Sequence, residues 1–196
     1  VEAHDNETLF DALTYKLPVA TSMRDRVRMQ TLALSTTALS QGVSFWHAGG
    51  DLLRSKSLDR NSYDSGDWFN KLDWTLNSNN WGVGLPPAAD NQATWPIMRP
   101  LLANPALKPT RADIVGAGEV FQEMLRIRKS SRLFRLTTAA DIQARVSFLN
   151  TGPAQKPGLI VMNLDGGGLS PSESRYGRIV VLVNANHEAQ TFTASA

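Results

Sequence analysis

The sequence predicts an α/β portion followed by an antiparallel β portion, and three observations support this. A helical pattern over 23–41 leads directly into a short apolar run over 42–47, as in an αβ unit. A long segment of low periodicity, about 48–109, then holds four of the five tryptophans. Finally, four short apolar runs, over 145–150, 158–163, 178–184 and 189–194, are separated by Gly, Pro, Ser and Asn, which is typical of antiparallel strands.

The composition predicts a packed core and excludes several classes of protein. The chain has 196 residues, of which 42% are hydrophobic and 19% charged, and its net charge is +2. That charge is too small to indicate nucleic-acid binding, and no apolar run approaches the ~20 residues of a membrane span. Because cysteine is absent, a disulfide scaffold and a thiolate metal site are excluded. We therefore expect neither nucleic acid nor a membrane as a partner.

The first long helix has a recognisable start and end. Ser22 is a suitable N-cap, and Gly42 is a suitable stop after a helix over 23–41. The apolar run over 42–47 that follows predicts a short buried strand.

A second helix is predicted to begin after Thr110, with Asp113 as the partner in a weak capping box. An extended stretch over 133–135 follows it, and Thr138 caps a brief helix over 139–144. The apolar side of the second helix is expected to pack in the core; it consists of Ile114, Val120, Phe121, Met124, Leu125 and Ile127.

The segment 45–70, FWHAGGDLLRSKSLDRNSYDSGDWFN, mixes acids, bases and amides with large aromatic side chains. Carboxylates, amides and arginines bind sugar hydroxyls, and aromatic rings stack on the C–H faces of sugars. This mixture therefore favours a pocket for a polyhydroxylated ligand. Because tryptophans are seldom left in water, we expect the longer segment 48–109 to fold onto the rest of the chain.

The aspartates of this region have two other interpretations, as turn formers or as calcium ligands. Their spacing does not match an EF-hand loop; they are Asp51, Asp59, Asp64, Asp67 and Asp73. Sugar binding fits them better, because other polar and aromatic side chains alternate with them; these are Arg54, Arg60, Tyr63, Trp68 and Asn70.

The pair His4-Asp5 is the most distinctive short motif. It is open to two interpretations, a helix cap or loop hydrogen bond, and a functional site. Metal binding is not favoured, because the three histidines, His4, His47 and His187, lie far apart in the sequence. A Ser-His-Asp triad has no nucleophile elbow to support it.

Several motifs together resemble one family. HDNETLFD at 4–11 is similar to the last of the four short regions shared by the α-amylase superfamily. LRSKSLDRNSYDSGDWFNKLDWT at 53–75 and NNWGVGLPP at 79–87 resemble type I pullulanases and plant limit dextrinases, the starch-debranching enzymes. FRLTTAADIQARVSFLNTGP at 134–153 and PGLIVM at 157–162 resemble the start of their C-terminal β domain.

The resemblance implies a fold and a reaction. It implies the C-terminal part of a (β/α)8 barrel over 1–135, with a substrate-binding loop over 48–109, and the start of an antiparallel β-sandwich over 136–196. The implied reaction is the retaining hydrolysis of α-1,6-glucosidic branch linkages in pullulan, amylopectin and limit dextrins. The expected partners are an α-glucan substrate and the rest of the barrel. No cofactor is required, calcium is an open option, and a bacterial protein would be secreted or at the cell surface.

The resemblance also assigns residues. Asp5 matches the carboxylate that stabilises the transition state, and His4 would bind the same sugar. Substrate-binding positions on the non-reducing side match Asp59 and Arg60, and four residues match less closely in the same loop: Tyr63, Asp64, Asp67 and Asn70.

The motifs that carry the family's nucleophile and acid/base do not occur in this sequence, nor does YNWGYDP. We therefore expect a C-terminal piece of a longer enzyme, inactive alone. The alternatives are a non-catalytic carbohydrate-binding module and a calcium-stabilised structural domain.

Overall fold

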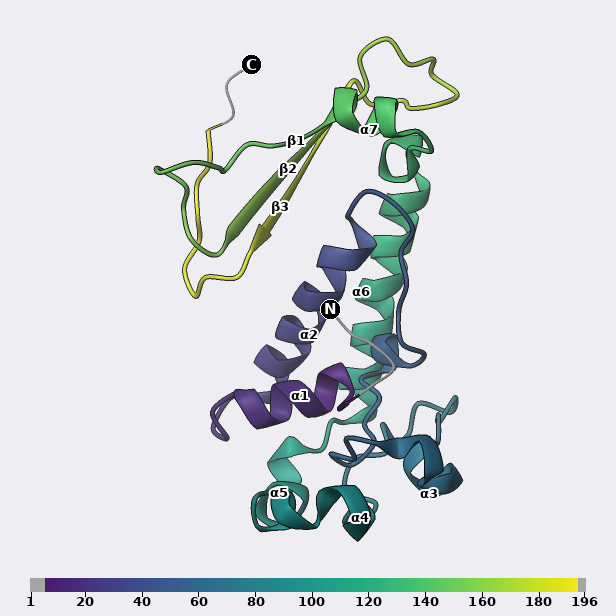
Figure 1. The fold of residues 1–196 in the computed structure, drawn as a ribbon, viewed down its shortest axis with the longest axis vertical. Helices are drawn as coiled ribbons and strands as arrows, with labels where there is room; N and C mark the ends of the chain where they lie inside the picture. Colours follow the sequence, from purple (N-terminus) through teal and green to yellow (C-terminus); the bar gives the residue numbers. More distant parts are fainter. Residues whose placement is uncertain (1–5, 194–196) are drawn as a thin grey trace. The chain divides into compact units, whose positions relative to one another are not determined.

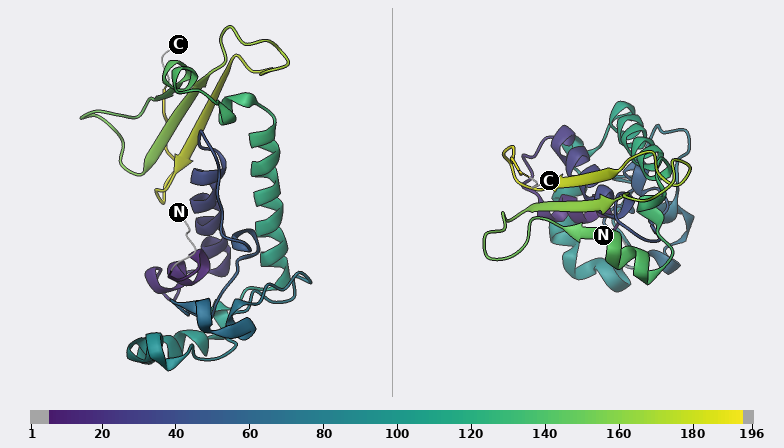
Figure 2. Two further views of the ribbon diagram at one scale, coloured as in Figure 1. Left: turned by 45° about the vertical axis from the view of Figure 1, so that its right-hand side comes forward. Right: turned by 90° about the horizontal axis from the view of Figure 1, so that it is seen from above.

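The structure is a computed structural model that describes residues 6–193, and it divides into two compact units. The first unit comprises the chain up to Leu34 together with Phe45–Gln122, and the second comprises Ser35–Ser44 and the chain from Glu123 onward. Figures 1 and 2 show the elements, which in chain order are α1 (Leu9–Lys16), α2 (Met23–Ala38), η1 (Gly50–Leu52), η2 (Ser62–Asp64), α3 (Gly66–Asn70), α4 (Ala88–Asn91), η3 (Gln92–Thr94), α5 (Trp95–Leu102), η4 (Pro105–Leu107), α6 (Arg111–Lys129), η5 (Arg132–Arg135), α7 (Ala139–Arg145), β1 (Val146–Phe148), β2 (Leu159–Asp165) and β3 (Arg178–Asn184).

The core of the first unit joins helices to irregular segments. It brings side chains of α1, α5, η4 and α6 against buried residues of the segments between η1 and α4; the cluster is Phe10, Leu53, Leu58, Trp81, Met98, Leu101, Leu107, Ile114 and Ala117. Phe10 and Trp81 meet edge to face, with ring centroids 5.7 Å apart and planes at 75°. Burial of each large side chain stabilises the unit by about 1.5–3 kcal/mol, so residues of the irregular segments contribute to the same core as those of the helices.

The predicted helix starts are confirmed by their hydrogen bonds. The Ser22 hydroxyl accepts from the Asp25 N–H at 3.1 Å at the start of α2. At α6, the Thr110 hydroxyl accepts from the Asp113 N–H at 3.3 Å while the Asp113 carboxylate accepts from the Thr110 N–H at 2.8 Å, which is a reciprocal capping box. Thr138 caps α7 in the same way that Ser22 caps α2.

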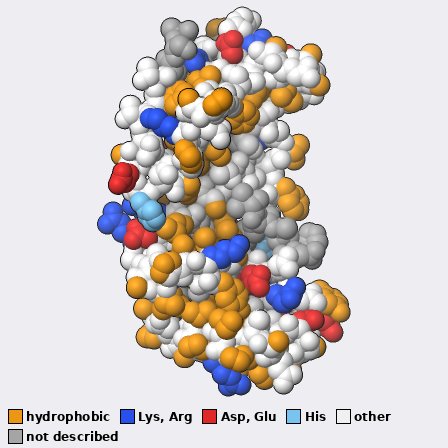
Figure 3. Space-filling view, turned by 60° about the vertical axis from the view of Figure 1, so that its left-hand side comes forward, with side chains coloured by type: hydrophobic (Ala, Val, Ile, Leu, Met, Phe, Trp, Pro, Cys, Tyr) orange, Lys and Arg blue, Asp and Glu red, His pale blue; other side chains and the backbone are white. Residues whose placement is uncertain are grey.

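The second unit contains an antiparallel three-stranded sheet in the order β1-β2-β3, as the sequence predicts. Met162 of the central strand pairs with Phe148 on one side and with Val181 on the other. One face of the sheet is covered by buried residues of η5 and its C-terminal neighbour Leu136. The unit also exposes apolar side chains of its strands, including Phe148 and Leu182, and Figure 3 shows hydrophobic side chains at its surface.

Arg128, near the end of α6, satisfies the C-terminal end of α2. Its buried guanidinium donates to the carbonyl oxygens of Ala38 at 3.0 Å and Ser40 at 2.7 Å, and also to that of Gly42. A helix leaves its last carbonyls without partners inside the helix. Arg128 thus supplies donors from another element, and burial lowers the pKa of its side chain without removing its charge at neutral pH.

The predicted strand over 42–47 is wrong. The structure has no strand there, and the side chain of Val43 is 100% exposed. The Gly42 N–H donates to Phe134 O at 3.3 Å, and the Ser44 hydroxyl donates to Thr37 O at 3.0 Å. These bonds shape a turn after α2, and an apolar run becomes a strand only where a neighbouring strand pairs with it.

Three smaller differences concern the second half of the chain. The stretch predicted as extended over 133–135 belongs to the 3-10 helix η5. No strand forms over 189–193, while Ala194, the last residue of that predicted strand, lies outside the described residues. On α6, Ile114 and Met124 are buried as expected, but three other members of its predicted apolar side are exposed: Val120, Leu125 and Ile127.

Helix α2 ends at Ala38, before the predicted end at Gln41. In the described part of the chain, no helix is both long enough and apolar enough to cross a membrane.

We predict that Arg128→Met weakens the C-terminal end of α2 by about 3 kcal/mol, because three carbonyl groups lose their charged donor. Native-state hydrogen exchange of residues 35–44 in the full-length protein measures this local opening. The matched control is Arg126→Met, which removes an exposed arginine paired with Glu123 at 2.8 Å and should cost less than about 1 kcal/mol. Equal effects of the two substitutions would contradict the capping role of Arg128.

Candidate functional site

The segment 53–59 reaches its shape through left-handed backbone at non-glycine residues. Leu53, Ser57 and Leu58 have φ of 58°, 51° and 69°, a region that residues with a Cβ seldom occupy. The side chains of Leu53 and Leu58 are fully buried in the core of the first unit. Their burial offsets the conformational cost, so the surrounding structure determines the shape of this segment.

Asp11 of α1 is at the centre of the contacts that hold this segment. Its fully buried carboxylate accepts hydrogen bonds from Ser55 Oγ at 2.6 Å, from the Lys56 N–H at 2.8 Å and from the Leu58 N–H at 3.2 Å. Burial raises the pKa of Asp11 to about 6, while these hydrogen bonds act in the opposite direction. At neutral pH the group is therefore mostly ionised, and the contact is charge-assisted.

The asparagine-rich stretch before Trp81 supports the same segment from another direction. Asn79 donates from Nδ2 to Leu53 O at 2.8 Å, and the backbone carbonyl oxygen of Asn79 accepts from the Ser55 N–H at 2.8 Å. The Ser57 hydroxyl donates to Asn80 O at 2.9 Å. These bonds satisfy buried backbone groups that have no helix or sheet partner.

Asp59 lies below the surface and not on it. Its carboxylate is fully buried and accepts from Asn91 Nδ2 at 3.0 Å and from the Asn61 N–H at 3.2 Å, both at Oδ1. Asp59 Oδ1 thus holds the Asn61 turn and the Asn91 side chain, and the substrate contact that the resemblance implies for Asp59 stays a prediction. An aspartate at the start of a tight turn satisfies nearby N–H groups with its own side chain, and the sequence pattern does not distinguish this role from ligand binding.

A line of side-chain hydrogen bonds leads from this segment to α3. Lys56, itself buried, donates from Nζ to Ser62 Oγ at 2.5 Å. The Ser62 hydroxyl donates to Asn70 Oδ1 at 3.0 Å, and Asn70 Nδ2 donates back to Ser62 O at 2.7 Å. Asn70 also donates to Gly66 O at 3.0 Å, so its amide is bonded both to Ser62 of η2 and to the first residue of α3.

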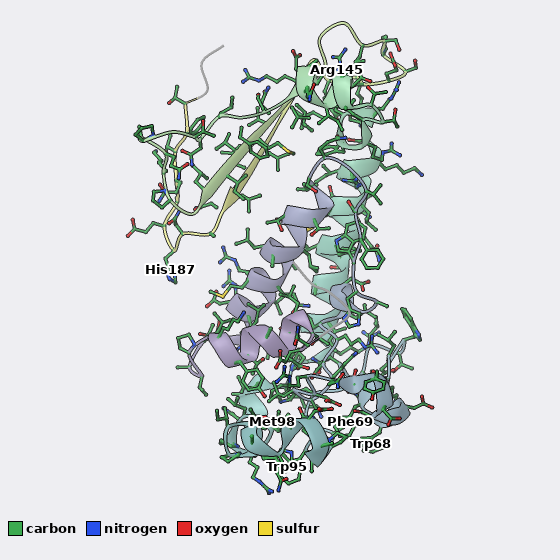
Figure 4. The ribbon with its side chains drawn as sticks, in the orientation of Figure 1. Trp68, Phe69, Trp95, Met98, Arg145 and His187 are labelled. Atoms are coloured by element: carbon green, nitrogen blue, oxygen red, sulfur yellow. The ribbon has the colours of Figure 1, made fainter. Side chains whose placement is uncertain are left out.

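Beside α3 lies a hollow of about 330 Å³, lined by Asp67, Trp68, Asn70 and Lys71. The indole of Trp68 is 65% exposed, and its Nε1 donates to Val83 O at 2.9 Å. Figure 4 shows Trp68 next to Phe69, whose ring is buried. An exposed aromatic face beside a carboxylate, an amide and an ammonium group provides the contacts that a sugar needs.

The other predicted site residues are divided between the surface and the undescribed part of the chain. Asp67 and Asn70 line the hollow, whereas Arg60, Tyr63 and Asp64 are exposed outside its lining, with Tyr63 at 87% exposure. His4 and Asp5 lie outside the described residues.

The tryptophans follow the expectation of burial only in part. Trp81 is buried in the core and Trp95 packs against it, but Trp74 is 72% exposed, more than Trp68. The segment over 48–109 is also more regular than the sequence predicts, because it contains seven short helices among its described residues, from η1 to η4. One such helix, α5, has Pro96 in its first turn, where proline is compatible with helical backbone, and a second proline, Pro100, in its interior.

The acidic residues do not gather into a metal site in the described part of the chain. Among residues 6–193, no group of three or more His, Asp or Glu side chains is placed to hold a metal ion. Asp51 is partly buried in η1, and burial raises its pKa. Asp73 is at the surface, where hydrogen bonds from Thr75 lower its pKa.

Sequence reasoning missed the importance of Asp11. The residue is the last of the HDNETLFD motif, and the motif alone does not distinguish it from an ordinary polar residue of an amphipathic helix. The sequence does contain a signal: Asp11 lies between Phe10 and Ala12. The residues one helical turn further on are Thr14, which is buried, and Tyr15, which packs against the core. Only the fold reveals that it faces Ser55, 44 positions along the chain.

The sequence of this chain is similar to those of known proteins along its whole length. Residues 76–196 match the family model for the C-terminal region of pullulanase-type α-1,6-glucosidases. The whole chain is 50% identical to the chloroplastic pullulanase 1 of Arabidopsis thaliana, of which it covers 21%. It is 40% identical to a pullulanase of Klebsiella pneumoniae, of which it covers 18%. The chain thus spans about a fifth of the length of these relatives.

Solved structures are similar over the same region. A Klebsiella pneumoniae pullulanase in complex with maltotriose superposes with a TM-score of 0.86 and 41% identity, covering 94% of this chain and 18% of that one. A mutant pullulanase of Paenibacillus barengoltzii in complex with maltotetraose gives a TM-score of 0.71 at 26% identity, covering 100% of this chain and 24% of that one.

We predict that ionisation of Asp11 lowers the free energy of unfolding of the first unit as the pH rises from 3.8 to about 6. The native state binds the Asp11 proton more tightly than the unfolded chain does, so stability is highest below the unfolded pKa and falls as the pH rises through the folded one. The decline is roughly 2–3 kcal/mol, at about 1.4 kcal/mol per pKa unit. Native-state hydrogen exchange of α1 in the full-length protein, over a pH series, measures it.

The control for this pH dependence is Asp11→Asn, which cannot ionise and should lack the decline. Asp51, whose pKa burial also raises, is present in both proteins, so its contribution cancels in the difference. Parallel stability profiles of the two proteins would show that Asp11 does not titrate in this range.

Proposed function

Because the chain belongs to the family of pullulanase-type α-1,6-glucosidases, we propose that the full-length protein is a starch-debranching glycoside hydrolase. Its substrates are α-glucans with α-1,6 branch linkages, such as pullulan, amylopectin and limit dextrins. The proposal is supported by sequence identity that extends along the whole chain, to pullulanases of a plant and of a bacterium.

In this proposal the reaction retains the anomeric configuration and takes place on a (β/α)8 barrel. Residues 1–135 are the C-terminal part of that barrel, and residues 136–196 are the start of a β-sandwich domain. The nucleophile and the acid/base are two carboxylates about 5–5.5 Å apart, and other parts of the protein provide them. Asp5 contributes a third carboxylate, which stabilises the oxocarbenium-like transition state, and His4 binds the same sugar.

The observation that carries the proposal within this chain is the exposed indole of Trp68 beside the hollow. A tryptophan of this size is 65% exposed although its N–H is already satisfied by Val83. The ring face is thus left for an apolar partner, and the C–H face of a glucose unit is one. Asp67, Asn70 and Lys71 surround the same hollow with groups that bind hydroxyls.

We predict that Asp5→Asn in the full-length protein lowers kcat on pullulan by at least about 10²-fold, because the transition state loses a stabilising charge. Reducing-sugar release measures the rate, and circular dichroism checks that the variant is folded. The matched control is Asp165→Asn at an exposed carboxylate of β2, which should leave kcat unchanged. Normal turnover of Asp5→Asn would refute the assignment, and binding without hydrolysis by the unmodified protein would favour a carbohydrate-binding module.

We predict that Trp68→Ala weakens maltotriose binding by about tenfold, because a stacking surface is lost. Calorimetric titration of the full-length protein measures the dissociation constant. Trp68→Phe should keep part of the affinity, since it retains a ring. Trp74→Ala is the control, because Trp74 is even more exposed than Trp68 but absent from the lining of the hollow. A loss of affinity as large as that of Trp68→Ala would contradict the location of the site.

A further inference from the structure

The segment that carries Lys56 binds the Asp11 carboxylate with converging backbone N–H groups. The Lys56 and Leu58 N–H groups both point to Oδ2 of Asp11, at 2.8 and 3.2 Å. This convergence requires the left-handed backbone of Ser57 and Leu58, with φ of 51° and 69°. Successive N–H groups arranged in this way form a concave site for an anion, and here the anion is a side chain of the protein itself.

A carboxylate in this position is costly, which distinguishes Asp11 from an ordinary core residue. Desolvation outweighs its hydrogen bonds, as its raised pKa indicates. A neutral side chain of the same size would avoid this cost, but it would not keep all three contacts. An asparagine oxygen could accept from both N–H groups, but its amide nitrogen would then lie against Ser55 Oγ, whose hydroxyl would lose its acceptor. The charge therefore selects one conformation of segment 55–58 at the expense of stability.

That conformation determines where Lys56 points. From the backbone N–H that Asp11 holds, the Lys56 side chain reaches Ser62 Oγ at 2.5 Å. Ser62 in turn donates to Asn70 Oδ1 at 3.0 Å. Asn70 and Trp68 both belong to α3 and both line the hollow. Each contact in this series lies within the first unit, and none is longer than 3.0 Å apart from the Leu58 bond.

We propose that Asp11 is a positioning residue for sugar binding: by fixing segment 55–58 it sets Lys56 and Ser62, and through them the Asn70 amide that lines the hollow. The inference rests on the proposed function, because it takes the hollow beside Trp68 as a glucan site. Asp11 does not touch the sugar. Its effect is to hold α3 in the geometry that binds a glucose unit without rearrangement.

The test compares Asp11→Asn with Thr14→Val in the full-length protein. Thr14 is also buried on α1, and its hydroxyl donates to Phe10 O at 2.9 Å, so its loss perturbs the same helix without touching segment 55–58. Steady-state kinetics on pullulan give KM and kcat for each variant. We expect Asp11→Asn to raise KM by about tenfold, with kcat changed by less than about twofold, because ground-state binding is affected and the reacting groups are not. Thr14→Val should leave both unchanged.

Ser62→Ala tests the same relay without removing a buried charge, so it remains informative if Asp11→Asn does not fold. It removes the hydroxyl that links Lys56 to Asn70 and should also raise KM. Maltotriose titration of each variant in the Asp5→Asn background measures binding independently of turnover. Unchanged KM in Ser62→Ala, or equal effects of Asp11→Asn and Thr14→Val, would overturn the inference. A full-length protein that neither hydrolyses pullulan nor binds maltotriose would instead refute the proposed function.

Discussion

The contact between the buried Asp11 carboxylate and segment 55–58 is the constraint on which the first unit depends. It joins α1 to a segment that has no helix or strand, and it does so with a charged acceptor and three donors. The segment needs such an acceptor because its left-handed residues turn two N–H groups inward. Leu53 and Leu58 then fill the core on either side, so packing and polar satisfaction support the same conformation.

Asparagines supply hydrogen bonds to backbone groups of the irregular segment, as a neighbouring strand does in a sheet. Asn79 and Asn91 lie in the interior and bond to buried groups of segment 53–61, including Oδ1 of the Asp59 carboxylate. Trp68 is left exposed at the surface, beside the hollow. Amides and one carboxylate thus bond the interior of an irregular segment, and α3, which lines the hollow, follows directly after it.

Local signals in the sequence are sufficient for the helix caps and for the three strands of the sheet. Ser22, Thr110 and Thr138 act within four residues of themselves, so their roles are visible in the sequence. The prediction of a strand over 42–47 is wrong because strand formation depends on a neighbouring strand, which hydropathy does not reveal. In the structure, Arg128 donates to the Gly42 carbonyl oxygen instead. Asp59 and Asp11 show the same limit, because the composition of a segment does not reveal which of its carboxylates are buried.

The most direct test of this account is a crystal structure of the full-length protein soaked with maltotriose. The account predicts a glucose unit stacked on the Trp68 indole, with hydroxyl groups within hydrogen-bond distance of Asp67 and Asn70, and the Asp11 contacts to segment 55–58 unchanged. Maltotriose bound elsewhere in the first unit, with the Trp68 face free of sugar, would contradict it.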